Sequence, residues 1–426
     1  MSATRVLVVD DSAVIRRAVS EILERDPDIE VVGQAANGNL ALARMVELKP
    51  DVVTLDIEMP VMDGLETLRQ MKKAGLTFPV IMCSTLTERG AMATLDALSL
   101  GAACYVTKPS SSGSATESIE SLRRELVPKV KALGKHRSRP AAPLTRPLSS
   151  PQAKGSAAPT LEAPSPAPTS LVSKPGVQKK STVVPTEAAP RTESAPSKKS
   201  AKQPAVASPV QSSVPQKSGS PAIFVPTFRR TAKVEAVVIG VSTGGPNALA
   251  VVLPSLPGDF PVPVLIVQHM PPVFTKLVAD RLNTQCSLSV REAVASELVR
   301  PGSILIAPGD FHMVFEREWA GVRVCLNQEP AVNFCRPAVD VMFHSAVATY
   351  GAGLLAVVLT GMGSDGALGC QAVNDAGGQV IVQDAETSVV WGMPGAVFER
   401  GVAEAVLPVE GIAKEIVRRV TASGRS

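Results

Sequence analysis

The feature that most constrains this chain is a long stretch without aromatic residues, which separates two blocks of ordinary composition. Between Tyr105 and Phe224 the sequence has no Phe, Trp or Tyr, and Pro, Ala, Ser, Thr and Lys dominate it. A segment of this composition buries too little apolar surface to offset the entropy of ordering its backbone. We therefore expect a long disordered linker over 131–230 between an N-terminal domain, 1–130, and a C-terminal domain, 231–426.

Charge follows the same division. From His136 to Ile223 there are twelve Lys and Arg against three Asp and Glu, whereas the whole chain has a net charge of +4. The linker is either a solvated spacer or a basic tether for an acidic partner. The remaining blocks together are net acidic, and the C-terminal block has no basic recognition helix. These features argue against binding to nucleic acid.

Location and redox state are indicated by what the sequence lacks. No apolar run reaches the roughly 18–20 residues of a membrane span, and residues 1–5 lead directly into the apolar run Val6–Val9 without a signal-peptide pattern. The six cysteines are scattered and form no Cys-x-x-Cys pair, which argues against a zinc site and a disulfide framework. We expect a soluble, cytoplasmic protein that is not inserted in a membrane.

Both blocks alternate short apolar runs with amphipathic helical patterns, which predicts two α/β domains with doubly wound parallel sheets. In such sheets, functional sites form at the carboxyl ends of the strands. The expected strands of the first block are Val6–Val9, Val31–Val32, Val52–Leu55, Val80–Cys83 and Cys104–Val106. Those of the second block are Val234–Ile239, Val264–Val267, Ile304–Ala307, Leu354–Leu359 and Val380–Val382.

In the first block, acidic and polar side chains follow successive strands. Asp10 and Asp11 follow the first strand, Asp56 the third, Ser84 ends the fourth and Lys108 follows the fifth. Three converging carboxylates repel one another unless a cation joins them, and oxygen ligands suit Mg²⁺. With a hydroxyl and a lysine beside them, they suit an aspartate that accepts a phosphoryl group.

These residues, together with Met59-Pro60, Asp63-Gly64 and Thr107-Lys108-Pro109, resemble the receiver domain of bacterial response regulators over about residues 1–125. The resemblance implies a flavodoxin-like fold with Asp56 as the phosphoacceptor. It implies that Mg²⁺ is bound by Asp11, Asp56 and the Glu58 backbone carbonyl, with Asp10 assisting. It also implies Ser84 and Tyr105 as the switch pair that senses the phosphate, with Lys108 as its positive charge.

In the second block, the first strand leads into Gly240-Val241-Ser242-Thr243-Gly244-Gly245, a Gly-x-Ser-x-Gly pattern between a strand and a helix. A sharp turn there exposes the Ser242 hydroxyl, and backbone N–H groups after it point where an oxyanion could form. A tight turn without chemistry is the plain alternative. A phosphate-binding loop fits less well, because the lysine and the Gly-x-Gly-x-x-Gly spacing are absent.

Four histidines are candidates for the general base. His269 follows the second strand and so ends beside Ser242, which makes it the first choice. His312 is the rival base, His344 fits a packed helix position, and His136 falls in the linker. Asp365, in a glycine-rich loop after Leu354–Leu359, is the expected orienting acid, with Asp310, Asp340 and Asp384 as weaker rivals.

The second block resembles the catalytic domain of the chemotaxis protein-glutamate methylesterases over about residues 232–421. The motifs that carry the resemblance are Gly240–Gly245, Gln268-His269-Met270, Pro308-Gly309-Asp310 with His312, and Thr360–Gly366. The resemblance implies a Rossmann-like domain with Ser242 as nucleophile, His269 as base and Asp365 as orienter. It places the oxyanion hole at Thr243 and Met362. The linker is much longer than the short hinge usual in the family.

Together the two resemblances imply a phosphorylation-activated esterase that hydrolyses glutamate γ-methyl esters on chemoreceptors and also deamidates receptor glutamines. A chemotaxis histidine kinase would supply the phosphoryl group, Mg²⁺ would serve the receiver, and the esterase reaction would need no cofactor. One alternative is a response regulator whose C-terminal domain only binds a partner. The other is a transcription-type regulator, against which the charge distribution argues.

Overall fold

The structure is a computed structural model that describes residues 3–85, 87–108, 115–137 and 232–422. The expected linker, 131–230, begins inside a helix that runs to Arg137, and its other residues lie outside the described ones. Within the described residues, no helix combines the length and the apolar character needed to cross a membrane.

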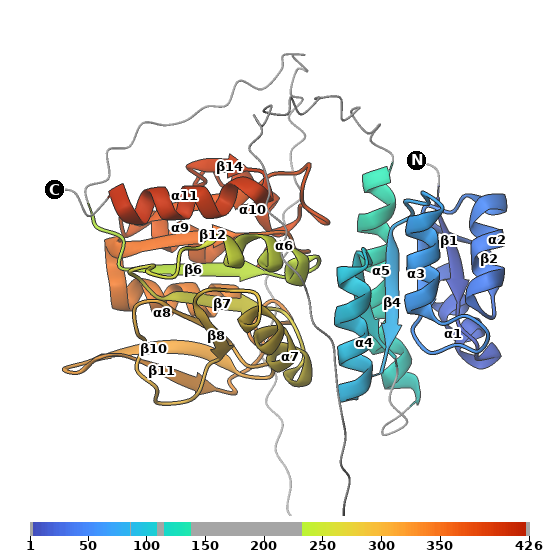
Figure 1. Cartoon of the computed structure of the whole chain (residues 1–426), viewed down its shortest axis with the longest axis horizontal. Helices are drawn as coiled ribbons and strands as arrows, with labels where there is room; N and C mark the ends of the chain where they lie inside the picture. The colour runs from blue at the N-terminus through green and yellow to red at the C-terminus, as the bar shows by residue number, and fades with distance from the viewer. Residues whose placement is uncertain (1–2, 86, 109–114, 138–231, 423–426) are drawn as a thin grey trace, which may run out of the picture. The chain divides into compact units, whose positions relative to one another are not determined.

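The N-terminal domain is a five-stranded parallel sheet in the order β2-β1-β3-β4-β5 (Figure 1). This is the flavodoxin-like strand order of doubly wound folds. Its strands are β1 (Thr4–Val9), β2 (Ile29–Ala35), β3 (Val52–Asp56), β4 (Val80–Ser84) and β5 (Cys104–Thr107). Its helices are α1 (Ala13–Glu24), α2 (Gly38–Leu48), α3 (Gly64–Lys73), α4 (Glu88–Ser99) and α5 (Ala115–Arg137).

Successive residues of β1 face opposite sides of this sheet. Leu7 and Val9 belong to a cluster with buried side chains of α2, α3 and α4, while Val6 and Val8 belong to a cluster with those of α1 and α5. A strand buried on both faces is a continuous apolar run, which is why Val6–Val9 is recognisable in the sequence.

The C-terminal domain is built on a seven-stranded parallel sheet in the order β14-β13-β12-β6-β7-β9-β8 (Figure 1). These strands are β6 (Ala236–Val241), β7 (Val264–Gln268), β8 (Ser289–Glu292), β9 (Ser303–Ile306), β12 (Leu354–Val358), β13 (Gln379–Gln383) and β14 (Ala405–Leu407). A separate antiparallel hairpin is formed by β10 (His312–Glu318) and β11 (Gly321–Asn327).

Six helices flank this sheet. They are α6 (Gly245–Val252), α7 (Pro272–Asn283), α8 (Val339–Tyr350), α9 (Ala367–Asp375), α10 (Met393–Glu399) and α11 (Val409–Ala422). Along β6, Val237 and Ile239 cluster with buried side chains of α6, α7 and α11, whereas Ala236 and Val238 cluster with those of α8, α9 and α10. The helices therefore cover both faces of the sheet and leave the carboxyl ends of its strands for a site.

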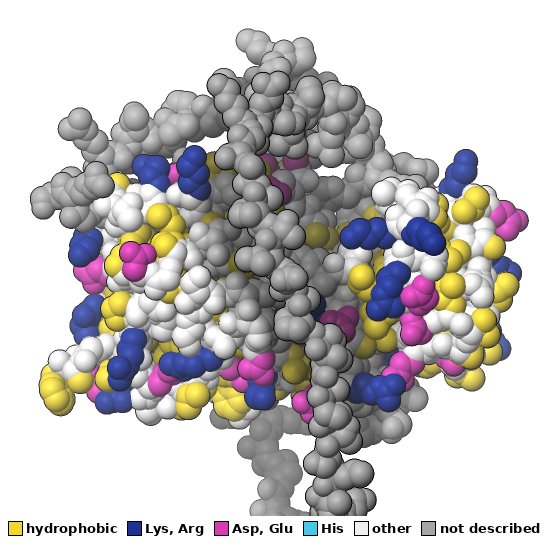
Figure 2. All heavy atoms as spheres, viewed as in Figure 1, with side chains coloured by type: hydrophobic (Ala, Val, Ile, Leu, Met, Phe, Trp, Pro, Cys, Tyr) yellow, Lys and Arg dark blue, Asp and Glu magenta, His cyan; other side chains and the backbone are white. Residues whose placement is uncertain are grey.

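The expected α/β fold with parallel sheets is confirmed for both domains, with shifts of one to three residues at strand ends. Three elements were not expected from the sequence: strand β8, the β10–β11 hairpin and the short edge strand β14. On the face seen in Figure 2, Lys and Arg side chains are interspersed with Asp and Glu over the described residues.

Candidate active site and phosphoacceptor site

Ser242 stands at the turn between β6 and α6, where the backbone is held on two sides. Its N–H donates to the Thr360 carbonyl at 3.0 Å, and its carbonyl accepts from the Gly245 N–H at 2.8 Å and from Gln268 Nε2 at 3.0 Å. A Cβ added at Gly361 would lie 2.9 Å from the Cβ of Ser242. Only glycine therefore allows the loop after β12 to approach the Ser242 side chain this closely.

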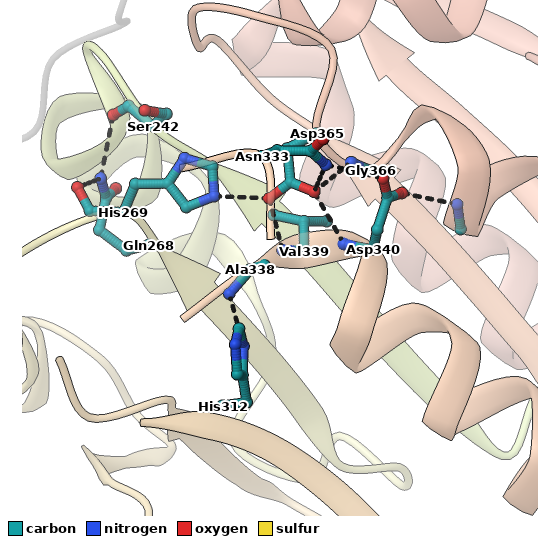
Figure 3. A network of polar contacts seen from close by, with 11 residues as sticks. Ser242, Gln268, His269, His312, Asn333, Ala338, Val339, Asp340, Asp365 and Gly366 are labelled. Atoms are coloured by element: carbon teal, nitrogen blue, oxygen red, sulfur yellow. Dashed lines mark hydrogen bonds and ion pairs between the residues drawn. The ribbon is translucent and has the colours of Figure 1, made fainter. Parts of the chain in front are cut away.

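His269 follows β7, the neighbour of β6, and its N–H donates to the Val241 carbonyl at 3.2 Å. Its Nε2 lies 2.8 Å from Asp365 Oδ2 (Figure 3). In that view Ser242 lies on the side of the imidazole away from Asp365. The described contacts include no hydrogen bond between the Ser242 hydroxyl and His269. Because Nε2 faces Asp365, Nδ1 is the nitrogen left to accept a proton from Ser242.

Both carboxylate oxygens of Asp365 are engaged by several donors. Oδ2 accepts from the Val339 N–H at 2.7 Å in addition to His269, and Oδ1 accepts from the N–H groups of Asp340 and Gly366, both at 3.0 Å. The Asn333 side-chain amide donates to Oδ1 at 2.9 Å. Asp365 is buried, and this shell fixes both the position and the ionisation of its carboxylate.

The charged forms of His269 and Asp365 stabilise each other. Burial raises the pKa of Asp365, but the hydrogen bond to His269 and backbone N–H donors lower it, and the result is a pKa of about 2. Burial lowers the pKa of His269, but the hydrogen bond to Asp365 and the adjacent Cys335 raise it to about 9. The pair thus favours the imidazolium form, which is the form that a general base reaches when it takes a proton.

A two-residue turn completes the surroundings of the pair. Val332 and Cys335 exchange two backbone hydrogen bonds, at 3.1 and 2.9 Å, around Asn333 and Phe334, which have positive φ angles of 53° and 62°. This is the pattern of a type I′ turn. Phe334 is 96% exposed. The Cys335 sulfur lies within 4.8 Å of ligand atoms of His269 and Asp365.

In the N-terminal domain, three carboxylates converge at the ends of β1 and β3. Oxygens of Asp10, Asp11 and Asp56 lie within 4.8 Å of one another. Lys108 Nζ lies 2.7 Å from Asp10 Oδ2 and 2.8 Å from Asp56 Oδ1. Asp11 is exposed and leaves one side of the cluster open. This all-oxygen donor set with an open side fits Mg²⁺, which keeps several of its waters when bound.

Within the described part of the chain, one oxygen of Asp56 is engaged and the other is not. The Ile57 N–H donates to Oδ1 at 2.7 Å, and Lys108 pairs with the same atom. Among the described residues, no hydrogen bond or ion pair involves Asp56 Oδ2. Burial raises the pKa of Asp56 to about 6, against the opposing effect of Lys108.

The other receiver residues lie around this cluster. Ser84 ends β4, and its hydroxyl donates to the Gly90 carbonyl at 3.1 Å and accepts from the Thr94 hydroxyl at 2.6 Å, both residues of α4. The Tyr105 carbonyl accepts from Lys129 Nζ at 2.7 Å. The exposed Glu58 side chain pairs with Arg89 at 3.6 Å, so a cation held by Glu58 would have to use its backbone carbonyl. Among the described contacts, the Ser84 hydroxyl makes no hydrogen bond to Asp56.

Two family models match the chain. A response regulator receiver domain matches residues 6–120, and a CheB methylesterase domain matches residues 237–416. A protein-glutamate methylesterase/protein-glutamine glutaminase of Nocardioides sp. is 45% identical over 99% of this chain and 96% of its own length. The protein of that name from Trichodesmium erythraeum is 40% identical over 99% and 100%. The chain belongs to the CheB methylesterase family.

Within this CheB-family domain, the structure argues against His312 as the base. His312 is buried, its Nδ1 accepts from the Ala338 N–H at 3.3 Å, and its Nε2 faces the Pro330 carbonyl at 3.2 Å. An imidazole with both nitrogens engaged by backbone has no free acceptor for a substrate proton. His344 lies on α8 with Nδ1 2.6 Å from the Asp340 carbonyl. His136 lies on α5, and its side chain is outside the described residues.

The rival acids are likewise engaged elsewhere. Asp310 pairs with Arg336 at 2.6 Å. Asp384 accepts from the Thr387 N–H and hydroxyl at 2.9 and 2.7 Å. Asp340 accepts from the Gly369 N–H at 2.7 Å and from the Asn333 side-chain amide at 3.1 Å, and its own N–H donates to Asp365.

The two expected oxyanion residues lie in loops that follow neighbouring strands. Thr243 follows β6 and Met362 follows β12, and these strands pair in parallel. The Thr360 hydroxyl donates to the Thr243 carbonyl at 2.9 Å and so ties the two loops together. Asn333, Phe334 and Cys335 were not anticipated from the sequence, because nothing in their local pattern shows that this turn reaches Asp365.

Proposed function

We propose that this CheB-family chain is a protein-glutamate methylesterase and protein-glutamine glutaminase controlled by phosphorylation. The observation that carries the proposal is the 2.8 Å contact between His269 Nε2 and Asp365 Oδ2, formed beside the Ser242 turn at the carboxyl edge of the sheet. Nucleophile, base and orienter from three separate loops are what ester hydrolysis by serine requires.

In the proposed reaction, the Ser242 oxygen attacks the ester carbonyl and its proton passes to His269 Nδ1. Asp365 holds the imidazole by its Nε2–H and stabilises the positive charge that forms. The backbone N–H groups of Thr243 and Met362 stabilise the oxyanion. The C–O bond breaks, and methanol leaves with the proton from His269. Water then hydrolyses the glutamyl ester of Ser242 by the same steps. From a glutamine side chain, ammonia leaves in place of methanol.

We propose that the substrate is a methylated glutamate on a chemoreceptor, as the names of the relatives and the resemblance suggest. The exposed Phe334, on the turn that carries Asn333 and Cys335, offers an apolar contact for the substrate chain at the edge of the site. The reaction would take place in the cytoplasm, where kinase-phosphorylated receivers act.

For the receiver, we propose that Asp56 accepts a phosphoryl group from a chemotaxis histidine kinase through Oδ2. Asp10, Asp11 and Asp56, with the Glu58 carbonyl, would hold Mg²⁺, which supplies charge neutralisation at the phosphoryl oxygens. Lys108 already lies against Asp56 and would stabilise the phosphoaspartate. Ser84 and Tyr105 would then report the phosphorylated state. We propose domains of 1–130, 131–230 and 231–426, with helix α5 extending the first to Arg137.

The test is to incubate the full chain with methyl-labelled receptor, with and without a small phosphodonor and Mg²⁺, and to measure released methanol. We expect release that rises with the phosphodonor and is absent in Ser242→Ala. If the receptor keeps its label with the wild-type chain, or Ser242→Ala releases methanol at the wild-type rate, the proposal is wrong. The second result would favour the alternative in which the C-terminal domain only binds a partner.

A further inference from the structure

One cluster of the C-terminal domain has a capability that ester hydrolysis does not use. A His269 ring nitrogen, the Cys335 sulfur and an Asp365 carboxylate oxygen lie within 4.8 Å of one another. The six cysteines are scattered in the sequence, and all are free. The fold nevertheless brings one of them to the histidine and the aspartate, from the turn 332–335.

We propose that His269, Cys335 and Asp365 form a binding site for a single Zn²⁺ ion, and that this ion reversibly inhibits the esterase. Nitrogen, sulfur and oxygen ligands from three residues are the set found in open zinc sites, with a fourth position left for water. The hard cations Mg²⁺ and Ca²⁺ prefer all-oxygen sites, so the thiol selects against them.

The distances require only small movements. Zinc bonds of about 2.0–2.3 Å at tetrahedral angles separate two ligand atoms by about 3.3–3.6 Å. His269 Nε2 and Asp365 Oδ2 are 2.8 Å apart, so an ion that replaces the proton between them must open this gap by about half an ångström. The Cys335 sulfur lies within 4.8 Å of the other two ligand atoms, so it must approach by about 1.5 Å at most. Rotation about side-chain bonds of His269 and Cys335 accommodates both shifts.

The surroundings of Asp365 suit a metal ligand as well as a triad acid. Its carboxylate keeps the N–H donors of Val339, Asp340 and Gly366 when the His269 proton is replaced. Partners of this kind orient ligands and raise metal affinity. Asn333 lies on the turn that carries Cys335 and bonds to Asp365 at 2.9 Å, so it ties the thiol-bearing turn to the carboxylate.

Inhibition follows from the chemistry of imidazole and rests on the proposed function. A neutral imidazole has one lone pair. A zinc ion on Nε2 uses that lone pair and leaves the proton on Nδ1, while an ion on Nδ1 occupies the position that faces Ser242. In either case the ring cannot accept the Ser242 proton, so the nucleophile is not activated. Removing the ion with a chelator restores the free base.

The decisive measurement is zinc binding, which does not depend on hydrolysis. The full chain is titrated with Zn²⁺ in excess Mg²⁺, which occupies the receiver carboxylates, by calorimetry or competition with a chromophoric chelator. We expect one site per chain. Loss of a residue that only hydrogen-bonds to a metal ligand lowers metal affinity roughly 10–100-fold. Loss of a ligand itself, in Cys335→Ala, should therefore lower zinc affinity at least about 100-fold. Cys325→Ala, on the hairpin strand β11, is the matched control and should bind as wild type does.

Two further readouts separate this proposal from the proposed function. Co²⁺ in place of Zn²⁺ should give a thiolate charge-transfer absorption in wild type and none in Cys335→Ala. Ser242→Ala should bind zinc as wild type does although it is inactive. Equal zinc affinity in wild type and Cys335→Ala, or no binding by wild type, overturns the zinc site. A zinc site found in a protein that hydrolyses no ester would overturn the proposed function and leave the site standing.

Discussion

Two buried aspartates in different domains, Asp56 and Asp365, have opposite surroundings. Asp365 accepts five hydrogen bonds, spread over both oxygens, and its pKa is about 2. Among the described contacts, Asp56 is engaged through Oδ1 alone, and burial raises its pKa to about 6. A carboxylate that orients another group can be saturated with donors. One that forms a bond itself must keep an oxygen available, so the contrast supports the proposed holding role of Asp365 and the proposed reacting role of Asp56.

The largest loss of activity is expected when Ser242 or His269, the proposed nucleophile and base, is replaced. Ser242→Ala and His269→Ala should each lower kcat about 10⁶-fold, and the double variant should be little worse, because the members of a triad act as a unit. The measurement is methanol release from methyl-labelled receptor. Ser255→Ala, whose hydroxyl bonds only to the Val251 carbonyl among the described contacts, is the control and should be fully active. A folded His312→Gln variant that lost as much activity as His269→Ala would contradict the choice of base.

The same substitution, Asp to Asn, should affect activity differently at Asp365 and at Asp56. Asp365→Asn keeps the shape but loses the charge that holds His269, and it should lower kcat about 10⁴-fold with and without phosphodonor. Asp375→Asn, at the end of α9 with an exposed contact to Gln371, is the matched control and should not alter the rate. Near-normal activity of Asp365→Asn would show that its donor shell has no part in catalysis.

Asp56→Asn should leave a basal esterase rate and abolish stimulation by phosphodonor. A phosphoryl group would add roughly −1.5 to −2 charge at neutral pH beside Lys108, and the amide cannot accept it. Two measurements apply: incorporation of labelled phosphate, and the ratio of rates with and without donor. A phosphodonor response that persists in Asp56→Asn would mean that another group carries the switch.

The smallest effect is a shift in pH dependence. His269 must be neutral to accept a proton, so its raised pKa of about 9 predicts that kcat/KM rises with pH up to about 9 and falls about tenfold per unit below it. In Asp365→Asn, His269 loses the hydrogen bond that contributes most to raising its pKa. The residual activity should therefore level off at a lower pH. The check is a pH–activity profile of both proteins, and equal midpoints would refute the pairing of His269 with Asp365.

Folding stability should depend on pH in the opposite direction. The proton bound to His269 stabilises the fold below about pH 6.5, and this contribution is lost as the pH rises through about 9.

The secondary structure could be predicted where strands are buried on both faces. Runs such as Val6–Val9 and Val264–Val267 are apolar throughout, so they stand out from the sequence without alignment. The β10–β11 hairpin could not be found in this way. In β10 the apolar residues Met313–Phe315 are followed by the exposed and charged residues Glu316–Glu318, so no apolar run extends along the strand. The edge strand β14 has three residues, all partly buried, which is too short for a reliable pattern.

The sequence by itself determined which residues end the parallel strands, and therefore which side chains meet at the carboxyl edges. This is why Ser242, His269 and the cluster of Asp10, Asp11 and Asp56 could be named in advance: the carboxyl ends of all parallel strands lie at the same edge of their sheet. Tertiary structure alone decided which nitrogen of His269 faces Asp365, which oxygen of Asp56 stays available, and that Cys335 joins the pair. These depend on side-chain rotation and on a turn that approaches from outside the sheet, and no local pattern of residues encodes either.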